Sequence, residues 1–167
     1  DGHDEGFDRV SDALGRMEKL IEDVLTLDRE GSDIGETEPV AIDSLASEAW
    51  SRVDTRDATL SVDDPGEVEA DEGRLASVFE NLFRNAVEHG GPEVAVTVGD
   101  TPEGFYVADD GPWLPADREG LFEWGKTTED DGSGLGLAIV ATVAEAHGWE
   151  IDAVDAADGG ARFEFAT

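Results

Sequence analysis

The spacing of the hydrophobic residues changes at residue 31, and this change constrains the fold more than any other feature. Before it, apolar residues recur at steps of three and four and form a heptad seam: Phe7, Val10, Leu14, Met17, Ile21 and Val24. A second seam beside the first contains Ala13, Leu20 and Leu27. Two adjacent seams are typical of a bundle helix. We therefore expect residues 5–29 to form a helix in a four-helix arrangement, most simply by dimerisation; docking on the chain's own domain is the alternative.

Beyond this segment the pattern alternates between helix and strand. Residues 31–37 are rich in glycine and polar residues and are predicted to be a linker. Strands are predicted at 38–40, 59–62, 68–70, 94–98, 105–107, 149–154 and 162–165, and helices at 44–53, 72–88 and 135–147. Asp43 or Ser44 is the expected cap of the first helix. This order predicts an α+β fold over residues 38–167, a two-layer sandwich of one mixed β-sheet with helices on one face.

The charge of the chain excludes one class of function. It has 42 acidic and 11 basic residues, which give a formal net charge of −31. Such a surface repels polyanions, so we expect no nucleic-acid partner. Nine of the basic residues are Arg and two are Lys. This balance suits a salt-loving source, since the Debye length at about 1 M salt is only about 3 Å; an ordinary acidic protein in dilute buffer would suffer more self-repulsion.

The sequence has no cysteine, which excludes disulfides and thiolate metal sites. It contains no apolar run of the roughly 18 residues that span a membrane and no secretory signal. We therefore expect a cytoplasmic location, without membrane contact from this segment. Asp1 stands where a protein would begin with Met, so we expect the chain to be part of a longer one, with any membrane anchor upstream.

Three short motifs carry candidate chemistry. A glycine run opens the last predicted helix and could cradle a phosphate on its amide groups, or could be a plain flexible hinge. Asn81 and Asn85 lie four residues apart on one helix face, as Mg²⁺ ligands or as two surface asparagines. Asp109 ends a predicted strand, where a buried carboxylate could accept a hydrogen bond from the adenine amine; an ordinary turn is the alternative.

The order of these motifs resembles the ATP-binding catalytic domain of sensor histidine kinases, in the gyrase, chaperone and MutL-type ATPase superfamily with its Bergerat-type ATP-binding fold. The resemblance covers residues 36–167, and residues 1–30 look like the second helix of the dimerisation and phosphoacceptor hairpin. It implies ATP and Mg²⁺ as cofactors and a homodimer formed through the hairpin. It also implies transfer of the γ-phosphoryl group to a His and then to an Asp of a response-regulator receiver domain.

The resemblance further implies roles for single residues. Asn85 matches the Mg²⁺ ligand and catalytic residue, and Asn81 matches a supporting ligand. Glu80 would assist proton removal, and His89 would contact nucleotide. Further cofactor contacts fall on the adenine acid and its glycine, on the F box and lid, and on the second glycine box: Asp109 and Gly111; Lys126, Thr127 and Thr128; Gly132, Ser133, Gly134, Leu135, Gly136 and Leu137.

Some positions depart from the family pattern. Trp113 replaces a glycine, Glu88 stands where a Lys is common, and Gly125 with Lys126 replaces an aromatic pair. Lys126 is therefore expected to be a phosphate contact, or else a solvated lid charge. These departures leave open a nucleotide-binding dimerising scaffold without phosphotransfer. A serine kinase of the anti-sigma type is a further alternative, against which the heptad helix argues.

The acceptor histidine is not found in this sequence. The family's acceptor begins a segment of the type His-Glu or Asp-x-Arg-x-Pro, whereas His3 is followed by Asp4-Glu5-Gly6 and is expected in the loop between the hairpin helices. His147 is expected at the end of a helix, beside the negative end of its dipole. The resemblance thus places the acceptor upstream of residue 1.

Overall fold

The computed structural model describes residues 36–90, 93–111, 136–156 and 160–167, together with Glu18, Ile21, Val24 and Leu25; the side chain of His89 is excepted. Most of the predicted heptad helix, the linker as far as residue 35, and the lid-like segment 112–135 therefore lie outside the described residues. Among the helices of the described ranges, none has both the length and the hydrophobicity needed to cross a bilayer.

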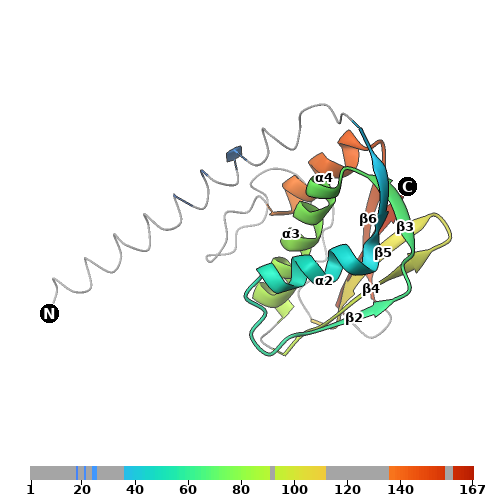
Figure 1. Cartoon of the computed structure of the whole chain (residues 1–167). Helices are drawn as coiled ribbons and strands as arrows, with labels where there is room; N and C mark the ends of the chain where they lie inside the picture. The colour runs from blue at the N-terminus through green and yellow to red at the C-terminus, as the bar shows by residue number, and fades with distance from the viewer. Residues whose placement is uncertain are drawn as a thin grey trace, which may run out of the picture.

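The elements follow the predicted order and form two layers, with the helices covering one side of a sheet (Figure 1). In chain order they are β1 (Glu38–Ala41), α2 (Ile42–Arg52), β2 (Thr59–Asp63), β3 (Glu67–Ala70), α3 (Glu72–Gly90), β4 (Ala95–Thr101), β5 (Gly104–Asp109), α4 (Gly136–Ala146), β6 (Glu150–Asp155) and β7 (Ala161–Ala166).

The main sheet has five strands in the order β2-β4-β5-β7-β6. β2 runs parallel to β4, and the other neighbours are antiparallel, so the predicted mixed sheet and α+β class are confirmed. The prediction of a single sheet is wrong in one respect, because β1 and β3 form an antiparallel pair of their own. The turn before β3 explains this: Asp64 and Gly66 have φ values of 42° and 78°, which redirect the chain away from the edge of the main sheet.

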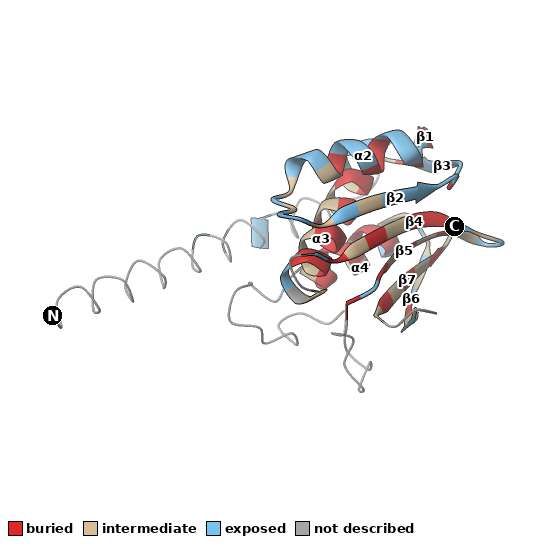
Figure 2. Cartoon of the chain, turned by 90° about the horizontal axis from the view of Figure 1, so that it is seen from below, coloured by how far each residue is buried: buried red, intermediate tan, exposed pale blue. Residues whose placement is uncertain are grey.

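The core lies between α3, α4 and the inward face of the sheet, where buried residues gather (Figure 2). The apolar residues that recur at the helical period along α3 are all buried: Leu75, Val78, Phe79, Leu82, Phe83 and Ala86. Phe105 of β5 stacks on Phe165 of β7, with ring centroids 4.6 Å apart. Helical and strand periodicities thus place the same kind of residue at one shared interface.

The start of α2 differs from the prediction. The helix begins at Ile42, its N-cap is Ala41, and no side chain caps it. The N–H of Ile42 donates to the carbonyl of Gly66 at 3.0 Å, and the Ile42 side chain is buried. The burial of the Ile42 side chain and the hydrogen bond to Gly66 therefore determine where α2 begins. Asp43 lies in the first turn, where its Oδ1 accepts from the N–H of Ser44 at 2.7 Å.

Candidate nucleotide-binding site

The sequence contains two asparagines, and both lie close to the first residue of α4. Asn81 and Asn85 lie one turn apart on α3, and α4 packs alongside with its first residue, Gly136, opposite them. A Cβ built on Gly136 would lie 3.4 Å from Oδ1 of Asn81 and 3.5 Å from Oδ1 of Asn85. Both amide oxygens therefore converge on one helix N-terminus, which is the positive end of the α4 dipole.

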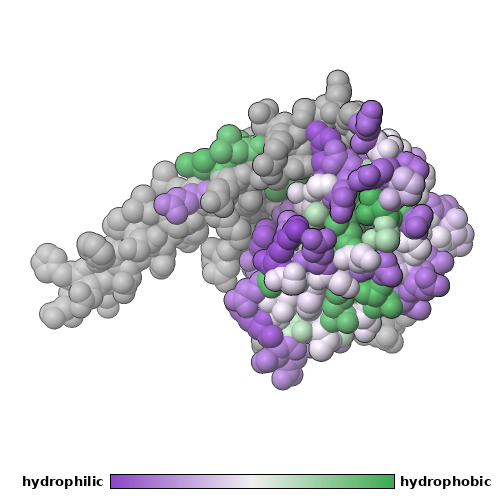
Figure 3. Space-filling model, viewed as in Figure 1, coloured by the Kyte–Doolittle hydropathy of each residue, from purple (hydrophilic) through white to green (hydrophobic). Residues whose placement is uncertain are grey.

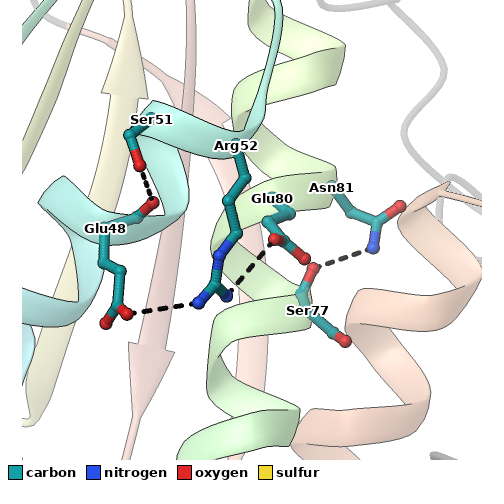
Figure 4. Close-up of polar contacts among 6 residues, drawn as sticks. All are labelled: Glu48, Ser51, Arg52, Ser77, Glu80 and Asn81. Atoms are coloured by element: carbon teal, nitrogen blue, oxygen red, sulfur yellow. Dashed lines mark hydrogen bonds and ion pairs between the residues drawn. The ribbon is translucent and has the colours of Figure 1, made fainter.

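Hydrogen bonding fixes the orientation of the Asn81 amide. Asn81 is buried, and its Nδ2 donates to the carbonyl of Ser77 at 2.8 Å (Figure 4). Because a carbonyl can only accept, the nitrogen must face Ser77 and Oδ1 must face α4. A buried amide oxygen held in this way suits a hard cation, and the interpretation of two surface asparagines does not describe Asn81.

A second part of the site is built around Asp109, at the end of β5. Its carboxylate is buried, and Oδ1 accepts from the N–H of Gly111 at 2.9 Å and from the N–H of Ala161 at 3.4 Å. These bonds tie the carboxylate to β7 and to the chain that leaves β5. Asp109 therefore occupies a defined position rather than an ordinary exposed turn.

Glycines allow three backbone segments to meet at this carboxylate. A Cβ on Gly111 would overlap Cα of Gly90, the last residue of α3. Gly160 has a φ of 93°, and a Cβ there would overlap the carbonyl oxygen of Asp109 and lie 2.6 Å from that of Gly111. Gly90 and Gly160 are absent from the predicted site. Their sequence signals, Gly90-Gly91-Pro92 and Asp158-Gly159-Gly160, were interpretable only as a helix stop and a strand connection.

Glu80 points away from the two asparagine oxygens. Its carboxylate pairs with Nη1 of Arg52 on α2 at 3.7 Å, and Nη2 of Arg52 pairs with Glu48 at 3.2 Å (Figure 4). The contact with Arg52 thus holds the Glu80 carboxylate on the α2 side of α3. Its catalytic role stays a prediction.

The remaining predicted contacts fall into two groups. Leu137 is buried in the core, so only its backbone can face a ligand. The side chain of His89 is not among the parts that the structure describes. The other predicted contacts lie outside the described residues: Lys126, Thr127, Thr128, Gly132, Ser133, Gly134 and Leu135.

The opposite end of α4 is closed by hydrogen bonds. His147 follows the last residue of α4, as predicted, and its Nδ1 lies 2.8 Å from the carbonyl of Val143. The N–H of Asp71 donates to Nε2 of His147 at 3.0 Å. Since Nε2 accepts from Asp71, the bond to the carbonyl of Val143 requires Nδ1 to be the donor. The imidazole also stacks on Trp149, with ring centroids 4.2 Å apart.

Residues 70–167 match the family model described as histidine kinase-, DNA gyrase B- and HSP90-like ATPase. The chain is 40% identical over 104 residues to the sensor histidine kinase ZraS of Klebsiella oxytoca, covering 59% of this chain and 22% of ZraS. It is 34% identical over 162 residues to the sensor protein CutS of Streptomyces coelicolor, covering 87% of this chain and 39% of CutS. The chain thus spans well under half the length of either relative.

Solved structures show the same similarity. The mycobacterial sensor histidine kinase MprB superposes with a TM-score of 0.64 at 27% identity, over 77% of this chain and 95% of that one. Full-length ShkA in complex with AMPPNP superposes with a TM-score of 0.69 at 31% identity, over 99% of this chain and 39% of that one.

Proposed function

Because this chain belongs to the histidine kinase-, DNA gyrase B- and HSP90-like ATPase family, we propose that it is the ATP-binding catalytic region of a sensor histidine kinase. The observation that carries the proposal is the convergence of two amide oxygens, from Asn81 and Asn85, on the N-terminus of α4. That arrangement offers oxygen ligands to a cation and a helix dipole to an anion within one small region. A magnesium-bound triphosphate has both charges.

The residues fit Mg²⁺ and ATP. Asn85 would hold the ion with support from Asn81, whose oxygen is already directed toward α4 by the bond to Ser77. When bound, the ion would neutralise phosphate charge, which a body with 42 acidic residues cannot do by itself. Asp109 would accept from the adenine amine, since its carboxylate is held by two backbone N–H groups.

The proposed reaction transfers the γ-phosphoryl group to a histidine and then to an aspartate of a response-regulator receiver domain. The acceptor histidine would lie upstream of residue 1. For this chemistry the protein's contribution is mainly positioning and charge neutralisation. The named histidine kinases among the relatives, ZraS and MprB, support this substrate class.

The test combines binding and transfer. Calorimetry in concentrated KCl should detect uptake of ATP that is strengthened by Mg²⁺, and Asn85→Ala should remove the strengthening while leaving magnesium-independent uptake. Labelled ATP supplied with an acceptor hairpin should then place phosphate on its histidine. Binding without transfer would favour the dimerising scaffold, and failure of the wild-type chain to bind Mg·ATP would reject the nucleotide site itself.

We also propose that the segment before α2 forms the dimer. Among its described residues, the apolar Ile21, Val24 and Leu25 are helical and have 57%, 38% and 63% of their surface exposed. Hydrophobic atoms of these described residues lie at the surface in Figure 3. Exposed apolar residues at helical spacing favour helix-on-helix association. Sedimentation should show a dimer that Ile21→Glu converts to monomer and that the neighbouring Glu18→Gln leaves intact.

A halophilic archaeal source is part of the proposal. Screening of the −31 charge should stabilise the fold, so the unfolding temperature should be higher in about 3 M KCl than in about 0.1 M KCl. Glycine betaine, a neutral osmolyte, serves as the control because it does not screen charge. An unfolding temperature that is independent of KCl would contradict this proposal.

A further inference from the structure

Arg84 lies on α3 between the two asparagines of the candidate site. At about 100° per residue, its position is about 60° around the helix from Asn81, on the side opposite to that of Asn85. Arg84 is half-buried, as is Asn85. The long arginine side chain therefore starts at the border of the helix face that meets the N-terminus of α4.

The ion pairs of the described residues leave Arg84 without a carboxylate. Those residues include five Arg and no Lys. Three of the five, Arg52, Arg74 and Arg162, form ion pairs, and none of the described ion pairs includes Arg84. Yet glutamates stand four residues before and four residues after it, at Glu80 and Glu88, the spacing at which helical ion pairs normally form.

The contact between α2 and α3 explains why Glu80 does not pair with Arg84. Arg52 binds Glu80 from α2 and is itself held by Glu48, one turn earlier on α2 (Figure 4). These two ion pairs hold the Glu80 carboxylate toward α2 and away from Arg84. Although the protein has 42 acidic residues, Arg84, which directly precedes Asn85 in sequence, forms none of the ion pairs of the described residues.

We propose that Arg84 donates hydrogen bonds to the phosphate chain of the bound nucleotide. This inference rests on the proposed function. A guanidinium stays protonated at all relevant pH values and presents several N–H donors in a plane that matches phosphate oxygens. Arg84 would add a fixed cation to the Mg²⁺ and the helix N-terminus. In an acidic domain this contact would also lower the repulsion that an approaching triphosphate meets.

Calorimetry with Mg·ATP, and NMR titration with adenosine, test this proposal on the whole chain. Arg84→Ala should weaken Mg·ATP binding about 10- to 100-fold, the effect of losing a charge-assisted hydrogen bond. Adenosine has no phosphate, and its affinity should stay unchanged. Arg84→Lys should recover part of the Mg·ATP affinity, because it keeps the charge but loses the planar donors.

Arg56→Ala is the matched control. It removes an equal charge from the exposed turn between α2 and β2, outside the α3–α4 pair, and should change Mg·ATP affinity less than twofold. Equal losses for ATP and adenosine in Arg84→Ala, or unchanged ATP affinity, would overturn the role of Arg84 while leaving the proposed function standing. Failure of the wild-type chain to bind Mg·ATP would overturn both.

Discussion

The two halves of α3 contact the rest of the protein by different chemistry. At the N-terminal end, Asp71, which directly precedes α3, forms an ion pair with Arg74, and the backbone N–H of Asp71 donates to His147 at the end of α4. In the C-terminal half, the neighbours are glycines: Gly136 lies opposite the asparagines, and Gly111 touches Gly90. Polar groups bond to one another at the N-terminal end of α3, whereas glycine backbone packs directly against its C-terminal half.

This difference separates contacts that serve only the fold from contacts that also shape the candidate site, along a single helix. Where polar groups satisfy one another, as the backbone N–H of Asp71 and Nε2 of His147 do, a ligand finds no free donor or acceptor to bind, and the contact serves the fold. Where glycine replaces a side chain, the backbone comes close while amide oxygens and helix N–H groups stay available. Substitutions at the N-terminal end should therefore change stability alone, and substitutions at the glycine contacts should change both stability and nucleotide affinity.

The largest effect is expected for Gly111→Ala, after β5, where the backbone meets the C-terminal end of α3. Its Cβ would overlap Cα of Gly90, and a backbone atom cannot turn aside as a side-chain end can. The end of α3 must then move away from β5, at a cost near the upper end of the overpacking range, about 3 kcal/mol. Thermal or denaturant unfolding measures this loss, and affinity for adenosine should fall together with stability.

Gly73→Ala is the matched control in the N-terminal half. A Cβ there would meet only Oδ1 of Asp71, at 3.6 Å, which is ordinary contact. Alanine also loses less backbone entropy on folding than glycine, so stability should stay equal or rise by up to about 1 kcal/mol. If Gly111→Ala proved as harmless as Gly73→Ala, the glycine contact would not be what brings α3 to β5.

Local patterns predicted much of this helix. Its apolar period placed residues from Leu75 to Ala86 in the core, because one helix face must be buried wherever the rest of the chain lies. The same reasoning predicted the strands and the α+β class. It also predicted Asn81 and Asn85 on one face, since spacing along a helix fixes their relation without any knowledge of partners.

The partners of these residues could not be predicted from local pattern. Asp71 and His147 are 76 residues apart in sequence, and neither has a neighbourhood that specifies the other. Gly90 looks like a helix stop, and Gly111 was predicted as a cofactor contact, but neither local pattern predicts that the two backbones touch. The predicted cap of α2 was wrong for the same reason. The acceptor for the N–H of Ile42 is the carbonyl of Gly66, in a turn that is distant in sequence.

The next largest effect is expected at the closed end, for His147→Phe. The change keeps an aromatic ring that can stack on Trp149, but it removes the acceptor for the N–H of Asp71. An unpaired, partly buried N–H costs about 1–3 kcal/mol, and the half-buried position of His147 favours the lower part of that range. Denaturant unfolding should detect the loss, while the affinity of the folded protein for Mg·ATP should not change.

His147→Gln sharpens this test. Its Oε1 can reach the place of Nε2 and accept from Asp71, so part of the stability should return. If nucleotide affinity fell in His147→Phe while stability did not, the two halves of α3 would not be separable in the way proposed here.

A smaller effect is expected for Asp71→Ala, which removes the side-chain cap of α3. Oδ1 of Asp71 accepts from the N–H of Arg74 at 3.2 Å, and Oδ2 pairs with Nη1 of Arg74 at 2.9 Å. Losing an N-cap costs typically about 1 kcal/mol. Asp71→Ser keeps a capping oxygen and should lose less; equal losses in the two variants would show that the ion pair, rather than the cap, holds this end.

The smallest effect is expected where α2 meets α3, for Glu80→Gln. The side chains of Arg52 and Glu80 are 52% and 25% exposed, and ion pairs so open to solvent contribute between 0 and about 1 kcal/mol. A double-mutant cycle with Arg52→Ala, run in dilute and in concentrated KCl, measures the coupling, which should fall toward zero as salt screens it. A coupling well above 1 kcal/mol that survived concentrated KCl would mean that this pair supports the fold as the Asp71–His147 contact does, and that the stabilising contacts of α3 extend along the helix as far as the turn that precedes Asn81.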